Sequence, residues 1–252
     1  MTHEASTLTH CAIHARDGEI GSVVDLLFDD DNWTVRWLVV DTGNWLPGRQ
    51  VLLPSSHLDA IDADQRRIAV ALTREQVKAS PGVETHLPVS RQAEAAIYGH
   101  YGWDPYWFGP VGLTGAGMGY PAAPPYVAPD IAHPAEGPDG GRPDADESPS
   151  VEDTHLRSVN EVTGYAIAAQ DGDIGHVEDF LIDENNGARP WSIHHIVVDT
   201  KNWWPGKFVL ITPDEVQDIR WNDRAMQVRR SREEIKQAPE YTPQSSRSAL
   251  GL

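Results

Sequence analysis

The 252-residue sequence contains little cysteine and comparatively little positive charge. Its single cysteine, Cys11, excludes an internal disulfide and a thiolate zinc cage, and it fits a reducing compartment. Lys and Arg number 20 against 38 Asp and Glu, which gives a net charge of −18. Because phosphate backbones are bound by clustered Lys and Arg, this balance predicts no nucleic-acid partner. It equally disfavours docking on anionic lipid.

Long apolar runs are also missing. No window approaches the roughly 20 apolar residues that span a bilayer, so no integral membrane segment is expected. The first residues, 1–7, show no basic segment followed by an apolar run, which is the pattern of a secretory signal. We therefore expect a soluble, cytoplasmic protein.

Motifs for catalysis, cofactors and metals are absent or weak. The glycine-rich run at 115–119 has its third Gly misplaced for a phosphate loop, and Pro121 stands where a helix should start. His194 and His195 are neighbours on an expected strand, so they face opposite sides and do not readily share a metal. Ser55-Ser56-His57 is typical of a loop, and no Gly-x-Ser-x-Gly elbow occurs. We expect no enzyme activity, no catalytic residues, no cofactor and no metal site.

What the sequence does contain is a repeat. Residues 41–48, Asp-Thr-Gly-Asn-Trp-Leu-Pro-Gly, return at 199–206 as Asp-Thr-Lys-Asn-Trp-Trp-Pro-Gly. Each copy lies between two β-branched runs, and its Pro and Gly are typical of a tight connection between strands. Residues 12–21 likewise match 166–175, at an offset of 166 − 12 = 154. The repeat predicts two copies of one small β domain.

Short strands are expected in the first copy at 12–15, 20–28, 33–41, 49–53 and 67–72. Within the second of these, Gly21 indicates a close backbone approach or a bulge. A short helix is expected from Arg74 to about Ala79, because Thr73 followed by Gln76 forms a capping-box pattern. Ser231 and Glu234 repeat that pattern in the second copy. The fold class predicted is mainly all-β: two small β-barrels, each with a short C-terminal helix, joined by a Gly/Pro-rich linker.

Composition sets the expected boundaries. The first repeat covers 8–88 and the second 154–242. Residues 89–153 between them are first rich in Gly, Pro and aromatic residues and then acidic, which predicts a mostly disordered linker. Residues 243–252 form a polar tail.

Two kinds of residue could carry function. Asp25 and Asp179, and likewise Asp41 and Asp199, recur at matching positions, and a structural role such as capping a turn explains them in both copies. Tryptophans are the stronger indication of recognition, acting either as plugs over a barrel end or as exposed contact anchors. The candidate partner-binding residues are Trp45, Trp203 and Trp204 in the strand connections and Trp103 and Trp107 in the linker.

Two motifs resemble a known family. Residues 17–25, Asp-Gly-Glu-Ile-Gly-Ser-Val-Val-Asp, and residues 36–42, Arg-Trp-Leu-Val-Val-Asp-Thr, resemble the PRC-barrel family, named after the cytoplasmic domain of the photosynthetic reaction centre H subunit. Residues 172–179 and 196–200 follow the same pattern. The resemblance implies small β-barrels that serve as assembly or interaction modules, of the free-standing, duplicated bacterial type. It supplies no catalytic residues.

Together these observations predict a non-enzymatic binding or assembly module for protein partners or small ligands. Its barrel edges could also pair in a homo-oligomer such as a dimer. Two alternatives remain open. The resemblance implies a peripheral component of a membrane photosynthetic or electron-transfer complex, and the carboxylates Asp41 and Asp199 at the Asp-Thr turns could serve an enzyme.

Overall fold

The computed structural model describes residues 1–79, except 44, 45, 47, 63 and 64, and residues 156–242, except 185–190 and 201–206. We call the two described parts the first half and the second half. The linker predicted at 89–153 and the tail at 243–252 lie outside the described residues.

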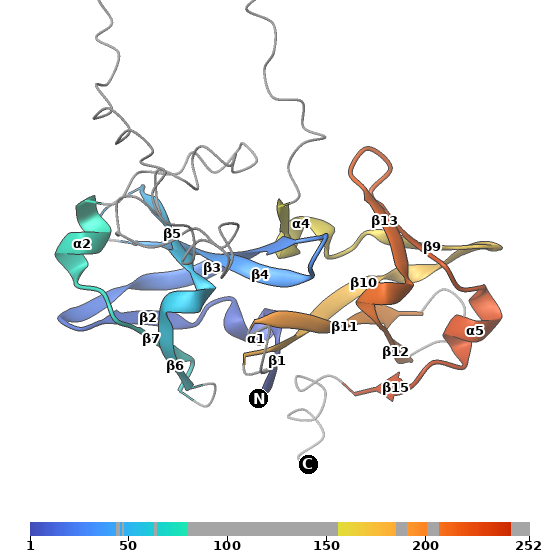
Figure 1. The fold of residues 1–252 in the computed structure, drawn as a ribbon, viewed down its shortest axis with the longest axis horizontal. Coiled ribbons are helices and arrows are strands. Elements are labelled where there is room, and N and C mark those ends of the chain that lie inside the picture. The colour runs from blue at the N-terminus through green and yellow to red at the C-terminus, as the bar shows by residue number, and fades with distance from the viewer. Residues whose placement is uncertain are drawn as a thin grey trace, which may run out of the picture.

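Strands dominate both halves (Figure 1). The first half contains, in order, β1 (Thr2–Glu4), α1 (Ala5–Leu8), β2 (Ala12–Ala15), β3 (Gly18–Asp29), β4 (Thr34–Asp41), β5 (Gln50–Pro54), η1 (Ser55–His57), β6 (Leu58–Asp62), β7 (Arg67–Val70) and α2 (Arg74–Ala79). The second half contains β8 (Leu156–Ser158), α4 (Val159–Val162), β9 (Ala166–Ala169), β10 (Gly172–Asp183), β11 (Ser192–Asp199), β12 (Phe208–Ile211), η5 (Pro213–Glu215), β13 (Val216–Arg220), β14 (Ala225–Val228), α5 (Arg232–Lys236) and β15 (Glu240–Tyr241). The prediction of a mainly β fold is confirmed, and the two halves have the same order of elements as far as α2 and α5.

Capping chemistry explains where the late helices start. The Thr73 backbone N–H donates to Gln76 Oε1 at 2.9 Å, and the Gln76 N–H donates back to Thr73 Oγ1 at 3.3 Å. Ser231 and Glu234 form the same reciprocal pair before α5. Each pair satisfies backbone donors that the first turn of a helix leaves without intrahelical partners. The helices predicted from these capping boxes are confirmed.

Several boundaries differ from the sequence prediction. The predicted first unit starts at residue 8, but β1 and α1 precede it, and β6 was not foreseen. The strand predicted from residue 33 begins at Thr34, because Trp33 adopts a left-handed φ of 53° that interrupts extended backbone. Trp191, at the matching position before β11, has a φ of 62°.

One sheet runs through both halves, in the order β13-β14-β9-β10-β11-β4-β3-β2-β7-β6, with the other strands paired beside this path. The halves join where β11 pairs with β4, with Ser192 opposite Thr34. Among the described strands, no strand pairing closes either half into a separate barrel. The chain therefore builds its two β units as neighbouring parts of a shared sheet.

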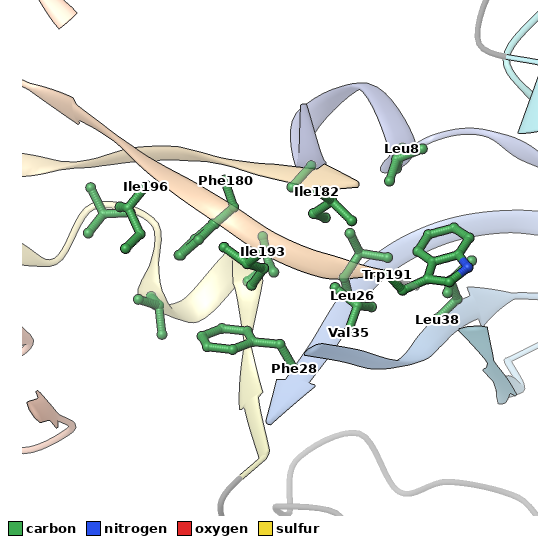
Figure 2. Close-up of a cluster of buried hydrophobic side chains, with 14 of the residues drawn as sticks. Leu8, Leu26, Phe28, Val35, Leu38, Phe180, Ile182, Trp191, Ile193 and Ile196 are labelled. Atoms are coloured by element: carbon green, nitrogen blue, oxygen red, sulfur yellow. The ribbon is translucent and has the colours of Figure 1, made fainter. Parts of the chain in front are cut away.

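The core is likewise shared. Buried apolar side chains of both halves form one cluster, in which the Phe28 and Phe180 rings lie 5.5 Å apart. Figure 2 shows side chains from both halves gathered around β3, β4, β10 and β11: Leu8, Leu26, Phe28, Val35, Leu38, Phe180, Ile182, Trp191, Ile193 and Ile196. Strands β4 and β11 lie in the middle of the sheet and are buried along most of their length, which fits their runs of β-branched residues.

Candidate functional site

The two halves exchange their first elements. Strand β1 of the first half pairs antiparallel with β10 of the second, with His3 opposite Ile182. In return, β8 of the second half pairs antiparallel with β3 of the first, with Arg157 opposite Phe28. Helix α1 contacts β10 of the second half and α4 contacts β3 of the first, so each helical turn lies against the other half (Figure 1). Each half therefore receives an extended segment followed by one helical turn.

Asp25 anchors the segment that β3 receives. Its carboxylate accepts a hydrogen bond from Ser158 Oγ at 2.5 Å and another from the Asn160 backbone N–H at 3.1 Å. Ser158 is also the N-cap of α4, because its Oγ accepts from the Glu161 N–H at 3.0 Å. The Asn160 side chain donates to the Val24 carbonyl. One carboxylate thus fixes both the end of β8 and the start of α4.

Asp179 holds the first turn of α1 in the segment that β10 receives. Its carboxylate accepts from the Ser6 backbone N–H at 3.1 Å and from the Ser6 hydroxyl. Glu4, two residues before Ser6, accepts a hydrogen bond from the Tyr241 hydroxyl at 2.7 Å. The predicted structural role of the matched pair Asp25 and Asp179 is therefore seen in detail, although the groups they bind lie far away in sequence rather than in a local turn.

Burial acts on both carboxyl groups in the same direction. Desolvation raises the pKa of Asp25 above its ordinary value, and the hydrogen bonds from Ser158, Asn160 and Leu26 only partly oppose it. Desolvation likewise raises the pKa of Asp179, opposed by the bonds from Ser6 and Phe180. Each carboxyl accepts hydrogen bonds from backbone N–H groups and from one serine hydroxyl of the exchanged segment, so it holds that segment in position.

The side chains of the Asp-Thr turns form hydrogen bonds within the turns themselves. Asp41 Oδ1 accepts from the Gly43 N–H at 2.8 Å. Thr42 Oγ1 lies 2.7 Å from the carbonyl oxygens of Leu46 and Arg49, and Thr200 Oγ1 donates to the Lys207 carbonyl at 2.9 Å. These bonds close the connection after β4 and after β11. They support a structural role for this motif.

Glycine permits the crossing of β3 over the end of β4. A Cβ placed on Gly21 would lie 1.9 Å from the Asp41 carbonyl oxygen, and one on Gly175 would lie 2.1 Å from the Asp199 carbonyl oxygen. Neither distance is compatible with a side chain at these positions. The close approach predicted for Gly21 is confirmed, and the second half repeats it.

One cluster was missed in the sequence. His176, Glu178 and Asp199 place one ligand atom each within 4.8 Å of the others. His176 Nε2 lies 3.7 Å from Glu178 Oε2 and 3.8 Å from Asp199 Oδ2. In the sequence, the spacing His-x-Glu on an expected strand indicates that both side chains lie on one face of the strand. This pattern could have pointed to two of the three residues. Only the pairing of β10 with β11 adds Asp199.

The remaining sequence candidates fall into two groups. The candidate partner-binding residues lie outside the described residues: Trp45, Trp103, Trp107, Trp203 and Trp204. Of the described tryptophans, Trp37 and Trp191 are buried, whereas Trp221 is 50% exposed between β13 and β14. Ser56 and His57 contact each other on η1, while the buried Ser55 donates instead to the Val35 carbonyl.

Within the described residues, no helix combines the length and the apolar character that crossing a membrane requires.

Comparison with protein-family models gives a match in the first half. The family model of the PRC-barrel domain matches residues 2–77, a range that runs from β1 into α2. Among curated proteins, none matches the chain. The matched range covers the motifs at 17–25 and 36–42 and every strand of the first half. Residues 2–77 of this chain are therefore similar to the PRC-barrel domain.

Proposed function

We propose that this protein is a non-enzymatic assembly module that holds protein partners by adding their extended segments to its sheet. The observation that carries the proposal is the reciprocal exchange, in which β3 accepts β8 and β10 accepts β1. The PRC-barrel match at 2–77 supports a binding or assembly role in the same direction.

The exchange supplies a mechanism for holding a segment. Backbone pairing gives the added strand its hydrogen bonds, and a buried carboxylate, Asp25 or Asp179, caps the helical turn that follows. Backbone pairing of this kind does not depend on the side chains of the added segment. The carboxylate of Asp25 or Asp179, in contrast, requires a hydrogen-bond donor at one position of that segment. A sheet that already receives two such segments from its own chain has the chemistry to receive another.

The two ends of the strand path are edges at which a further strand can add. Within the described part of the chain, β6 and β13 end the path, and each pairs on one side. Asp59 and Asp62 lie on β6, so two β6 edges would bring like charges together. With a net charge of −18 on the chain, a basic segment is the favoured occupant.

Site-specific photo-cross-linking tests the proposal. A photoreactive amino acid replaces the exposed Gln217 on β13 or Asp59 on β6 in the full chain, and the exposed Glu75 on α2 serves as the matched control. In extract of the native cells we expect the same basic partner to cross-link from an edge position and not from Glu75. Raising the salt concentration should weaken the capture, because steering by opposite charge is screened. Equal cross-linking from all three positions, or none from either edge, would contradict the proposal.

The tryptophans predicted as anchors are tested in the same assay. We expect W45A, the double variant W203A/W204A and the double variant W103A/W107A to lower partner recovery. Trp221→Ala is the control, because it removes an exposed tryptophan to which no anchor role is assigned. Recovery that falls equally in the control would show that exposed aromatic surface alone drives the capture.

A further inference from the structure

The His176, Glu178 and Asp199 side chains converge from a bulged pair of strands. His176 on β10 is the register partner of Asp199 on β11, and Val177 is the partner of Val198. The register then shifts between Val177 and Asp179, so Glu178 is the extra residue of a β-bulge. The bulge keeps Glu178 beside His176 and turns both toward the carboxylate across the strand.

The spacing suits a small divalent cation. The three ligand atoms lie within 4.8 Å of one another, and two of the distances are 3.7 and 3.8 Å. Zinc bonds of about 2.0–2.2 Å place the ligand atoms of a tetrahedral site roughly 3.4 Å apart. Small side-chain movements therefore close the site around an ion, and the His176 and Glu178 side chains, 37% and 43% exposed, are free to make them.

Burial distinguishes this cluster from ordinary surface charge. The Asp199 side chain is only 2% exposed, whereas the two residues facing it are open to solvent. The buried Asp199 carboxylate would act as a ligand of fixed position, whereas the exposed His176 and Glu178 side chains can move to complete the site. Gly175 sets this depth, because its missing Cβ lets β10 approach the Asp199 backbone closely.

The first half shows that the fold does not require the cluster. Its equivalent bulge lies between Val23 and Asp25, with Ser22 opposite Asp41. The positions of His176 and Glu178 are there taken by Ser22 and Val24, and the strand pair forms in the same register. The bulge therefore does not depend on having His and Glu at these two positions.

We propose that His176, Glu178 and Asp199 form a binding site for a divalent transition-metal cation, with Zn²⁺ as the favoured ion. One imidazole nitrogen with two carboxylate oxygens suits Zn²⁺, whereas Mg²⁺ and Ca²⁺ prefer ligand sets made of oxygen alone. Three protein ligands leave at least one coordination position for water or an incoming donor. This site is independent of the proposed assembly function.

Zinc titration of the full chain, stripped with a chelator, tests the site by calorimetry. The wild-type chain should bind one Zn²⁺ at this site with a preference over Mg²⁺. The double variant H176S/E178V, which installs the residues of the first half, should bind zinc more than about 100-fold more weakly, because loss of even outer-shell groups costs 10–100-fold. Its unfolding temperature without metal should equal that of the wild type.

The reverse exchange provides the matched control. The double variant S22H/V24E places the same ligands beside Asp41, and its zinc stoichiometry should rise by one. Zinc should raise the unfolding temperature of the wild type and leave that of H176S/E178V unchanged. Equal zinc affinity in the wild type and H176S/E178V would overturn the proposal. So would Mg²⁺ binding as tightly as Zn²⁺, or an unchanged stoichiometry in a folded S22H/V24E.

Discussion

Thr34 and Ser192 face each other as register partners, and they hold the same position in the two halves of the chain. On either side of this pair the backbone bonds cross over, since the Ile193 N–H donates to the Trp33 carbonyl at 2.7 Å and the Val35 N–H donates to the Trp191 carbonyl at 2.9 Å. The halves therefore meet about a local two-fold relationship. Their sheet and core continue across it, and this has consequences for stability.

Phe28→Ala should destabilise both halves together. The Phe28 ring stacks on Trp33 and contacts Phe180 of the second half, each at 5.5 Å between centroids. Loss of a buried Phe typically costs about 3–5 kcal/mol in unfolding free energy. Hydrogen exchange should show that amides of β11 lose protection along with those of β4. Lost protection confined to the first half would show that the halves unfold separately.

Ser158→Ala should lower the unfolding free energy by about 1–2 kcal/mol, because it removes the N-cap of α4 and a donor to Asp25. Urea denaturation measures the change. The control is Ser56→Ala, which removes an exposed hydroxyl that contacts the neighbouring His57 side chain. If both variants had the same midpoint, the Asp25 contact would have no part in holding the exchanged segment.

Asp25→Asn should change the pH dependence of stability. Burial raises the pKa of the Asp25 carboxyl in the folded protein above its ordinary value of 3.8. The contribution of this carboxyl to the unfolding free energy is therefore fully present below pH 3.8, and it is lost as the pH rises through the pKa of the folded state. The stability of the variant relative to the wild type should therefore increase with pH across that window. Urea midpoints measured between pH 4 and 7 show this trend.

The control for Asp25 has the opposite sign. The Arg232 backbone N–H lowers the pKa of the exposed Asp171 carboxyl, so the contribution of Asp171 is present above 3.8 and is lost as the pH falls. Asp171→Asn should lose stability relative to the wild type as the pH rises toward 3.8, so the urea midpoints for this variant are measured below pH 4. Parallel pH curves for the wild type and Asp25→Asn would contradict the assigned direction.

Gly175→Ala should cost about 3 kcal/mol or more in unfolding free energy, because its Cβ would lie 2.1 Å from a backbone oxygen and the strands must separate. Gly164→Ala is the matched control, with a φ of +87° and no atom within 4 Å of the added Cβ. It should show only the cost of a left-handed residue, about 1–2 kcal/mol. Thermal and urea unfolding of the two variants should therefore differ clearly, and equal losses would assign the whole effect to backbone conformation.

Cys11 should react slowly in the folded protein. Its side chain is buried, and desolvation raises the pKa of the thiol, which lowers the fraction of reactive thiolate. With a disulfide reagent we expect a rate at least about 100-fold below that of the urea-unfolded chain. A native rate close to the unfolded rate would show that α1 and β2 open readily.

The sequence prediction succeeded where the signal was local. The capping boxes at Thr73 and Ser231 predicted both late helices, and Gly21 indicated the close approach to Asp41. It failed to find β1 and α1, whose three and four residues carry no periodic pattern of their own. Such short elements form here because the other half supplies their hydrogen-bonding partners.

The sequence by itself determined the β class, the repeated turns and the late helices, because alternation, turn residues and caps act over only a few residues. Tertiary structure alone decided which half receives which segment, as in the bond from Ser158 to Asp25 across 133 residues. It also decided that Asp199 would join His176 and Glu178, since strand register brings these residues together. Contacts of this kind depend on which strands pair, and no short stretch of sequence encodes that choice.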